Sequence, residues 1–334
     1  MKTRKNLPLI VKYLIVAAVY ALFLLAGNLL IKNKVIGLYY TKVLMVVAIN
    51  MILAVSLNIG TGYLGQLPLG SAGFMAVGAY ASAIFMRKVP IDPKLIFPVG
   101  IILGGLVSGL FGLIIGLPAL RLKGDYLAII TLGFAEIIRI VILNIDKALG
   151  ITLTYGAANL KNIPKTTTFT NAFIWVFIAC FLIKAMMNSR HGRAILSIRD
   201  NEIAAESCGI NLTFYKTMAF VVYAFFTGVG GALYAGYLGI LNPSGFGFAK
   251  SIDILVIVVL GGMGSMTGSV ISSAVLTIVP ELLRAFSDYR MIVYSLLLII
   301  VMIFRPTGLM GTKEFNPRGI MDFFMGRKKR KEER

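Results

Sequence analysis

The chain has 334 residues, of which 58% are hydrophobic and 14% are charged. A soluble globular protein has about a quarter of its residues charged, so this composition excludes an ordinary soluble domain, and a mean hydropathy of +0.86 predicts an integral membrane protein. The 33 lysines and arginines against 14 acidic residues give a net charge of +19, an excess that in a membrane protein orients helices and contacts anionic lipid. No aromatic residue interrupts the basic run at residues 327–334, so the charge does not indicate nucleic-acid binding.

Apolar runs near the length needed to span hydrocarbon predict an all-α, polytopic fold. The first run follows a basic start, but it is longer than the core of a signal peptide and lacks a clear small-residue cleavage site, so we expect a membrane helix there. We expect about ten crossings, from residues 7–31, 43–60, 61–86, 95–119, 126–145, 172–187, 216–241, 251–283 (crossing twice) and 291–304.

The ends of the chain predict its orientation. An even number of crossings puts both termini on one side of the membrane, and basic residues are concentrated at both ends, which places that side in the cytoplasm. We therefore expect a single transmembrane domain over residues 1–326, with a cytoplasmic loop over 188–216, followed by a basic cytoplasmic tail over 327–334.

Two apolar segments are interrupted by glycines, at residues 60–80 and 261–269. Irregular backbone is tolerated at membrane depth only where protein or a water-filled cavity satisfies its polar groups. Paired interruptions are typical of inverted-repeat transporters with a central pathway, although close helix packing through small residues is an equally good interpretation. The pathway candidates from these segments and their neighbours are Asn58, Tyr63, Gln66, Ser71, Thr131, Gly261, Gly262 and Gly264.

Charge within the spans is scarce, which draws attention to Glu136 and Arg139. They lie three residues apart in an apolar run, so on a helix they can form an ion pair. Such a pair must face protein or water. It either fixes the rotation of the helix or lines a pathway or gate, and with no other ionisable group nearby it makes a poor proton relay.

The loop at 188–216 predicts a short capped helix over residues 200–209. Asp200 is a good N-cap, Glu202 lies in the first turn, Ala204 and Ala205 favour helix, and Gly209 is placed to end it. Capping at both ends lets a helix keep its shape without a hydrophobic core, as a docking element requires. An ordinary loop helix on the membrane surface is the alternative.

Patterns for catalysis are absent from the sequence. The nearest string to a phosphate-binding loop, residues 245–251, has Ala249 where the last glycine is required, so we expect no ATPase activity of its own. His191 has no neighbouring ligand set, so neither a metal nor a catalytic triad is expected. Cys180 and Cys208 predict no disulfide framework. We therefore expect neither an enzymatic activity nor a cofactor.

Several motifs occur in the order found in one family. The spacing Glu202-x-Ala204-Ala205-x-x-x-Gly209 resembles the short cytoplasmic motif by which ABC importer permeases engage their ATPase subunits. With the Ser-Arg-x-Gly-Arg-Ala string at 189–194, it resembles the branched-chain amino acid permeases, and specifically their longer, LivM-like branch. Further matching segments, from about residue 44 to 309, are residues 62–70, 120–129, 131–139 and 259–265.

The resemblance implies an assembly in the bacterial inner membrane. It implies a heterodimer with a LivH-like permease, although a homodimer with a second copy of this chain is the alternative. It also implies two cytoplasmic LivG/LivF-like ATPase subunits that use the ATP, and an extracytoplasmic binding protein that delivers leucine, isoleucine or valine. The residues that the resemblance assigns to ATPase coupling are Arg199, Asp200, Asn201, Glu202, Ala204, Ala205 and Gly209.

One departure from the family pattern affects the substrate. The family has Gly-Gln-x-Ser-Leu-Gly-His where this chain has Pro68 and Ser71 at the fourth and seventh positions, and related permeases carry urea, short amides or other amino acids. A self-sufficient channel or secondary transporter is the alternative from another class, motivated by Glu136 and the interrupted spans. A membrane scaffold is disfavoured, because it has no use for paired irregular backbone.

Overall fold

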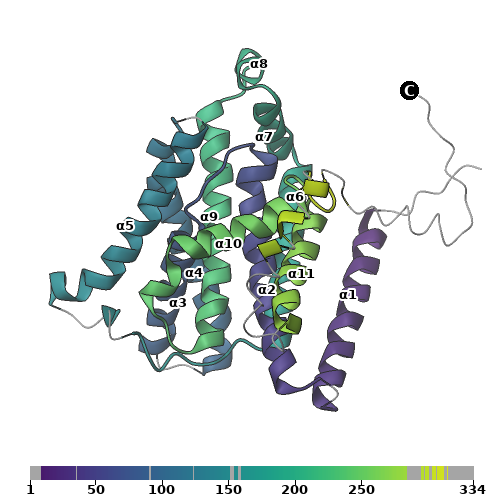
Figure 1. The fold of residues 1–334 in the computed structure, drawn as a ribbon, viewed down its shortest axis with the longest axis vertical. Helices are drawn as coiled ribbons and strands as arrows, with labels where there is room; N and C mark the ends of the chain where they lie inside the picture. The colour runs from purple at the N-terminus through teal and green to yellow at the C-terminus, as the bar shows by residue number, and fades with distance from the viewer. Residues whose placement is uncertain are drawn as a thin grey trace, which may run out of the picture.

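The structure is a computed structural model, and its described residues fold almost entirely into helices (Figure 1). Between the described residues, the only β pairing is an isolated bridge from Leu160 to Leu241, and no strand is formed. The predicted all-α class is therefore confirmed. The residues described are 9–34, 36–89, 92–122, 124–150, 154–156, 159–283, 295–296, 298–300, 303–305, 307–311 and 314.

The helices follow the predicted apolar runs closely. Each run as far as residue 241 contains one long helix, and the run at 291–304 lies mostly outside the described residues. The helices are α1 (Leu9–Lys32), α2 (Leu38–Asn58), the π-helix η1 (Ile59–Tyr63), α3 (Ser71–Lys88), α4 (Pro93–Ala119), α5 (Asp125–Leu149), α6 (Phe169–Asn188), α7 (Arg190–Asp200), α8 (Glu202–Ser207), α9 (Leu212–Leu238), the 3-10 helix η3 (Pro243–Phe246), α10 (Phe248–Gly261) and α11 (Met266–Leu282).

Length and composition identify 5 of the described helices as able to cross a membrane: α2 with η1, α4, α5, α6 and α9. Shorter apolar helices cover Ala18–Lys32 and Met266–Leu282. Large apolar side chains on the outer faces of α4 and α5, such as Leu106 and Ile129, are 60% and 65% exposed. These faces suit lipid as their solvent, so the chain is a multi-pass membrane protein.

The double crossing predicted for residues 251–283 needs correction. Helix α10 has only 14 residues, which give a length of about 21 Å against a hydrocarbon thickness of about 30 Å. It runs across the bundle about half way along it, at a wide angle to α9 (Figure 1). The preceding segment at 239–247, which includes η3, holds four glycine or proline residues, and these favour the start of α10 no earlier than Phe248.

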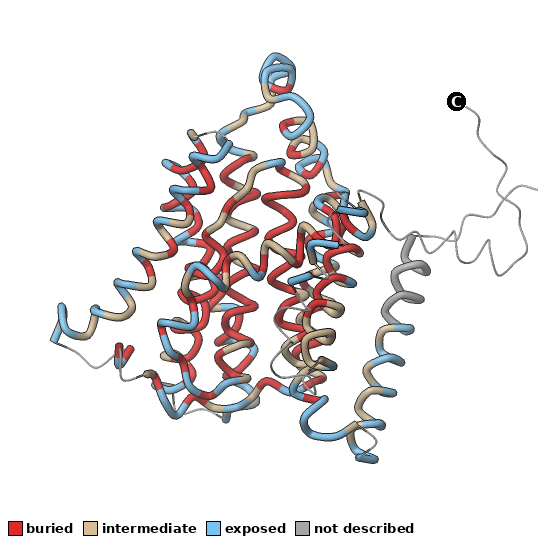
Figure 2. The backbone as a smooth tube through the Cα atoms, viewed as in Figure 1, coloured by how far each residue is buried: buried red, intermediate tan, exposed pale blue. Residues whose placement is uncertain are grey.

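The core lies between α2, α3, α4 and α9, where buried residues concentrate (Figure 2). Phe74, Phe220 and Tyr223 are fully buried there and pack edge to face, with Phe74 ring centroids 5.5 Å from Phe220 and 5.7 Å from Tyr223. Helices α7 and α8 project beyond this core at one end of the bundle, which is also the end at which α1 begins (Figure 1).

Candidate functional site

The predicted capped helix divides into two elements. Asp200 is the last residue of α7, not an N-cap, and its carboxylate is 3.1 Å from the guanidinium of Arg199. The N-cap of α8 is Asn201, whose Oδ1 accepts a hydrogen bond from the backbone N–H of Ala204 at 3.1 Å. The prediction was wrong by one residue because Asp and Asn both cap helices well, and only the extended backbone of Asn201, with φ −160° and ψ 110°, shows where α7 stops.

Gly209 ends α8 as predicted. Its φ of +82° lies in the left-handed region, where glycine avoids the penalty of a side chain. Its N–H donates to the carbonyl of Glu206, and the N–H of Ile210 donates to that of Ala205, which is the Schellman pattern of helix ends. Ala205 is 5% exposed and packs into the core, whereas Ala204 is exposed.

An ion pair anchors α8 to the membrane helices. Glu202 Oε1 lies 2.6 Å from Nζ of Lys216 in α9, and the lysine side chain is only 7% exposed. Removing either partner of a buried pair leaves an uncompensated charge, which is strongly destabilising. The sequence analysis missed Lys216, because it stands at the edge of an apolar run and nothing local pairs it with Glu202.

Arg199 joins α7 to both interrupted segments. Its Nη1 donates to the carbonyl oxygen of Gly62 in η1 at 3.0 Å. Positions Gly65 and Gly264 also lie directly beside its side chain. One arginine in the predicted coupling segment thus contacts both interrupted segments, which are far apart in the sequence. The interruption at residues 60–80 is named the first break, and that at residues 261–269 the second break.

The two breaks meet at Gly62 and Gly264. The N–H of Gly264 donates to Oδ1 of the fully buried Asn58 at 2.8 Å, whereas Nδ2 of Asn58 has no partner among the described residues. A methyl group at Gly62 would collide with the Asn58 side chain and the Gly264 backbone, so only glycine allows this approach. Gly261 and Gly262, at the end of α10, lie in the same segment.

Residues near the end of the described chain hold this junction together. The carboxylate of Glu314 accepts hydrogen bonds from the Tyr63 hydroxyl at 3.1 Å and from the first backbone N–H of α11, at Met266, at 2.6 Å. The N–H of Met310 donates to the carbonyl of Gly261. No local pattern in the sequence pointed to Glu314, because its two partners lie 48 and 251 residues away.

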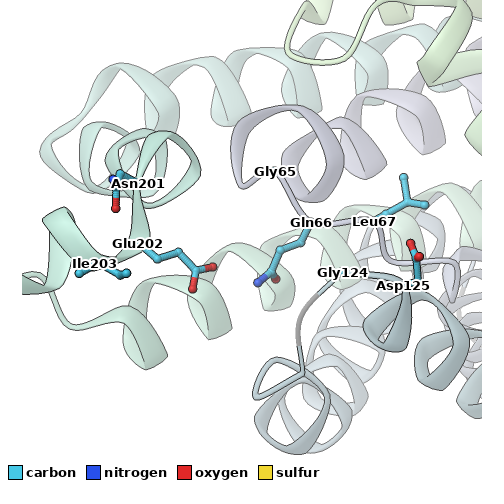
Figure 3. Close-up of a pocket in the computed structure, with 8 residues that line it drawn as sticks. All are labelled: Gly65, Gln66, Leu67, Gly124, Asp125, Asn201, Glu202 and Ile203. Carbon is cyan, nitrogen blue, oxygen red and sulfur yellow. The ribbon is translucent and has the colours of Figure 1, made fainter.

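A groove of about 370 Å³ lies between α8 and the first break. Its lining is Gly65, Gln66, Leu67, Gly124, Asp125, Asn201, Glu202 and Ile203. The side chains of Gln66 and Glu202 extend toward each other across it (Figure 3), and Oε1 of Gln66 has no partner in the described part of the chain. Ile203 is 77% exposed on α8, an unusual position for an apolar residue outside the bundle.

Two further candidates with a hydroxyl group, Ser71 and Thr131, hold the start of α3 in place. Ser71 Oγ lies 2.8 Å from the hydroxyl of Tyr223 in the core. Thr131 Oγ1 accepts a hydrogen bond from the N–H of Leu69 at 3.0 Å, which ties α5 to the irregular segment before α3. Both side chains are buried, so in this conformation they are packed inside protein and do not line an open space.

Glu136 and Arg139 form the ion pair expected from their spacing, with 2.6 Å between Oε2 and Nε. Oε1 of Glu136 also accepts the first N–H of α10, at Phe248, at 3.2 Å, and a negative charge stabilises a helix N-terminus. The pair lies near the middle of α5, and its side chains are 32% and 26% exposed. A charge at the bilayer centre costs about 2.5–3.5 kcal/mol on insertion scales, so this side of α5 faces protein or water.

These contacts form a continuous connection from α8 to both interrupted segments. Helix α8 is fixed to α9 by Glu202 and follows directly after α7. Arg199 of α7 contacts both breaks, and the second break lies at the end of α10. Within the described ranges, no three His, Cys, Asp or Glu side chains gather in a group that could hold a metal ion.

Residues 39–304 match the family model described as "Branched-chain amino acid transport system / permease component". The chain is 36% identical over 296 residues to the high-affinity branched-chain amino acid transport system permease protein LivM of Salmonella typhimurium, which covers 78% of this chain and 68% of that protein. It is 35% identical to LivM of Escherichia coli over the same length, and 31% identical over 159 residues to the LivH permease of Escherichia coli, covering 46% of this chain and 51% of LivH. No solved structure matches it.

Proposed function

Because the chain belongs to the permease family of branched-chain amino acid transport systems, we propose that it is a membrane-spanning subunit of an ABC importer for leucine, isoleucine and valine. The observation that carries the coupling mechanism is the contact of Arg199 with Gly62 at 3.0 Å. It connects a helix pair outside the bundle with the breaks inside it, as an importer driven by another subunit needs.

In this proposal an ATPase subunit holds α8 in a surface groove of its own. Ile203 is the apolar anchor, since it is 77% exposed, and Asn201 and Gly209 keep α8 rigid by capping both of its ends. Closure of the ATPases on ATP displaces α8. The displacement passes through α7 and Arg199 to the breaks at Gly62 and Gly264, and so shifts the equilibrium between two states of the pathway.

The remaining partners follow from this arrangement. A LivH-like second permease completes the pathway, two LivG/LivF-like ATPases bind on the side of α7 and α8, and an extracytoplasmic binding protein delivers the amino acid at the opposite end. The side of α7 and α8 is then the cytoplasm, with both termini on that side, in agreement with the basic residues at both ends of the chain.

The energy in this proposal comes from the ATPase subunits. This chain has no phosphate-binding loop in its sequence, and it works without a cofactor or a catalytic site. Asn58, Gln66 and the glycines of the two breaks are conformational elements at the cytoplasmic end of the pathway, while Glu136 and Arg139 stand deeper within it.

Reconstitution tests the proposal. The complete complex in proteoliposomes, with ATP inside and amino-acid-loaded binding protein outside, should accumulate radiolabelled leucine, isoleucine and valine but not urea, and this chain alone should accumulate none of them. Uptake by the chain alone without ATP would establish a channel or secondary transporter instead. Uptake of urea by the complex would keep the importer class and overturn the substrate.

A further inference from the structure

Helix α10 presents charge on an open face at mid-depth. Its first residue, Phe248, is hydrogen-bonded to Glu136 near the middle of α5, and the helix crosses the bundle about half way along it (Figure 1). Asp253 is exposed on α10 and Lys250, one turn earlier, is partly exposed. The sequence of this region predicted membrane crossings and no phosphate-binding loop, and neither charge was singled out.

These two charges differ from the neighbouring Glu136 and Arg139. Glu136 is satisfied by Arg139 and by the N-terminus of α10. Lys250 and Asp253 are three residues apart and therefore neighbours on the helix surface, but within the described part of the chain neither side chain makes a hydrogen bond or a salt bridge within 4.0 Å. Unlike Glu136, both therefore have hydrogen-bonding capacity to offer to a ligand.

Lipid is a poor surrounding for this face, because an acid and a base that are not joined by a direct salt bridge are strongly disfavoured in hydrocarbon. The residues beside Asp253 on the same face are apolar: Ala249 and Val256, one turn before and one turn after it, are exposed and partly exposed. The face thus combines one positive charge, one negative charge and a short apolar surface, on a helix whose end touches the breaks at Gly262.

We propose that this face of α10 is a transient binding site for the zwitterionic group of the transported amino acid, with Lys250 binding its carboxylate and Asp253 its ammonium group. The inference rests on the proposed function and deepens it. Opposite charges one helical turn apart match a ligand that carries both charges on one carbon, and Val256 offers a surface to a branched apolar side chain. With only two charged contacts in this proposal, the site binds weakly enough to release the solute.

Neutralisation of the charges tests this site in the complete reconstituted importer. Lys250→Met and Asp253→Asn should each lower leucine uptake per ATP hydrolysed by about tenfold, the effect of losing one charge-assisted hydrogen bond. The matched control is Lys184→Met, which removes an exposed lysine from α6 and should leave uptake unchanged.

The double variant Lys250→Met/Asp253→Asn separates a substrate site from a structural ion pair. If the charges bind the amino acid, the double variant stays as impaired as the single ones or becomes worse. If the charges only neutralise each other, uptake returns in the double variant. If they only bind the second permease, that permease no longer co-purifies with the single variants. Either result would overturn the proposal.

Thiol labelling gives a readout that does not depend on transport. In a chain with Cys180→Ala and Cys208→Ala, the substitution Ala249→Cys, one turn before Asp253 on the same face and outside the two proposed contacts, should react with a water-soluble cationic methanethiosulfonate reagent in the assembled importer, and leucine-loaded binding protein with ATP should slow the reaction. No reaction in any nucleotide state, or a reaction indifferent to leucine, would contradict the site. Leucine uptake by the unsubstituted importer is measured beside it, so failure of the importer function itself is seen separately.

Discussion

Helices α8 and α10 are both short, but they are held in opposite ways. Helix α8 is capped by its own neighbours, with Asn201 before it and Gly209 after it. Helix α10 has no side-chain cap from its own N-cap residue, and its first N–H bonds instead to Glu136, 112 residues earlier in the chain. The ends of α8 are thus defined by residues next to it in the chain, whereas the start of α10 is defined by a residue of another helix.

The two helices are nevertheless connected. Arg199 of α7 is hydrogen-bonded to the carbonyl of Gly62. Gly62 packs against the backbone of Gly264, and the segment that contains Gly264 directly follows the end of α10. A continuous set of contacts thus joins a self-capped element to one defined by long-range contacts.

The largest effect is expected from Gly62→Ala, which inserts a methyl group where the two breaks touch. The new Cβ would overlap the Asn58 side chain and the Gly264 backbone, and overpacking of this kind costs about 1–3 kcal/mol or more. We expect ATP-dependent uptake to be abolished and the thermal unfolding midpoint in detergent to fall. Gly133→Ala is the matched control, because no atom lies within 4 Å of the corresponding Cβ. Normal transport by Gly62→Ala would show that the breaks do not act through close contact.

Arg199→Met should uncouple the two helices without unfolding either. It removes the hydrogen bond to the Gly62 carbonyl, and bonds to charged groups contribute about 1.5–3 kcal/mol. ATP hydrolysis stimulated by the loaded binding protein should continue while leucine uptake falls. Arg190→Met removes an exposed arginine from the first turn of α7 and serves as the control. Equal losses of hydrolysis and uptake would instead mean that Arg199 is needed for ATPase docking.

Glu202→Gln should loosen α8 from α9 by leaving Lys216 buried without its partner. Because Glu202 is 28% exposed, we expect less than the full cost of breaking a buried pair, about 1–2 kcal/mol of stability. The double variant Glu202→Gln/Lys216→Met should be less destabilised than the sum of the two single variants, as measured by thermal unfolding in a double-mutant cycle. Additive effects would show that the pair contributes nothing specific.

Local physics explains which of these features the sequence could predict. The apolar runs predicted the long helices, since a membrane span needs only its own composition, and the spacing of Glu136 and Arg139 predicted their ion pair, because it depends on one helix. The end of α8 at Gly209 was predicted for the same reason. The start was placed one residue early, at Asp200, since the limit between α7 and α8 depends on backbone angles and not on residue type.

Long-range contacts explain what the sequence left out. Lys216 meets Glu202, Glu314 meets Tyr63 and Met266, and Arg199 meets Gly62, each across a separation that no local pattern encodes. The short span of α10 was missed because its apolar residues match those of a full crossing, and its position depends on contacts with α5 and with residues 309–310. The prediction that the glycine-rich segments correspond to one another in an inverted repeat stays a prediction, although they do touch.

The smallest effect is expected from Gly209→Val, which acts on α8 alone. A β-branched residue at φ +82° pays about 1–2 kcal/mol for the left-handed conformation, so the last turn of α8 should unwind while the rest of the chain stays folded. Uptake and stimulated ATP hydrolysis should fall together, by less than in Gly62→Ala, because the docking surface is altered before any force reaches Arg199. Gly209→Asn should retain most activity, since asparagine tolerates this conformation better than other residues with a side chain. If valine and asparagine behaved alike, the conformation at residue 209 would not matter and the self-capped shape of α8 could not be what the ATPase recognises.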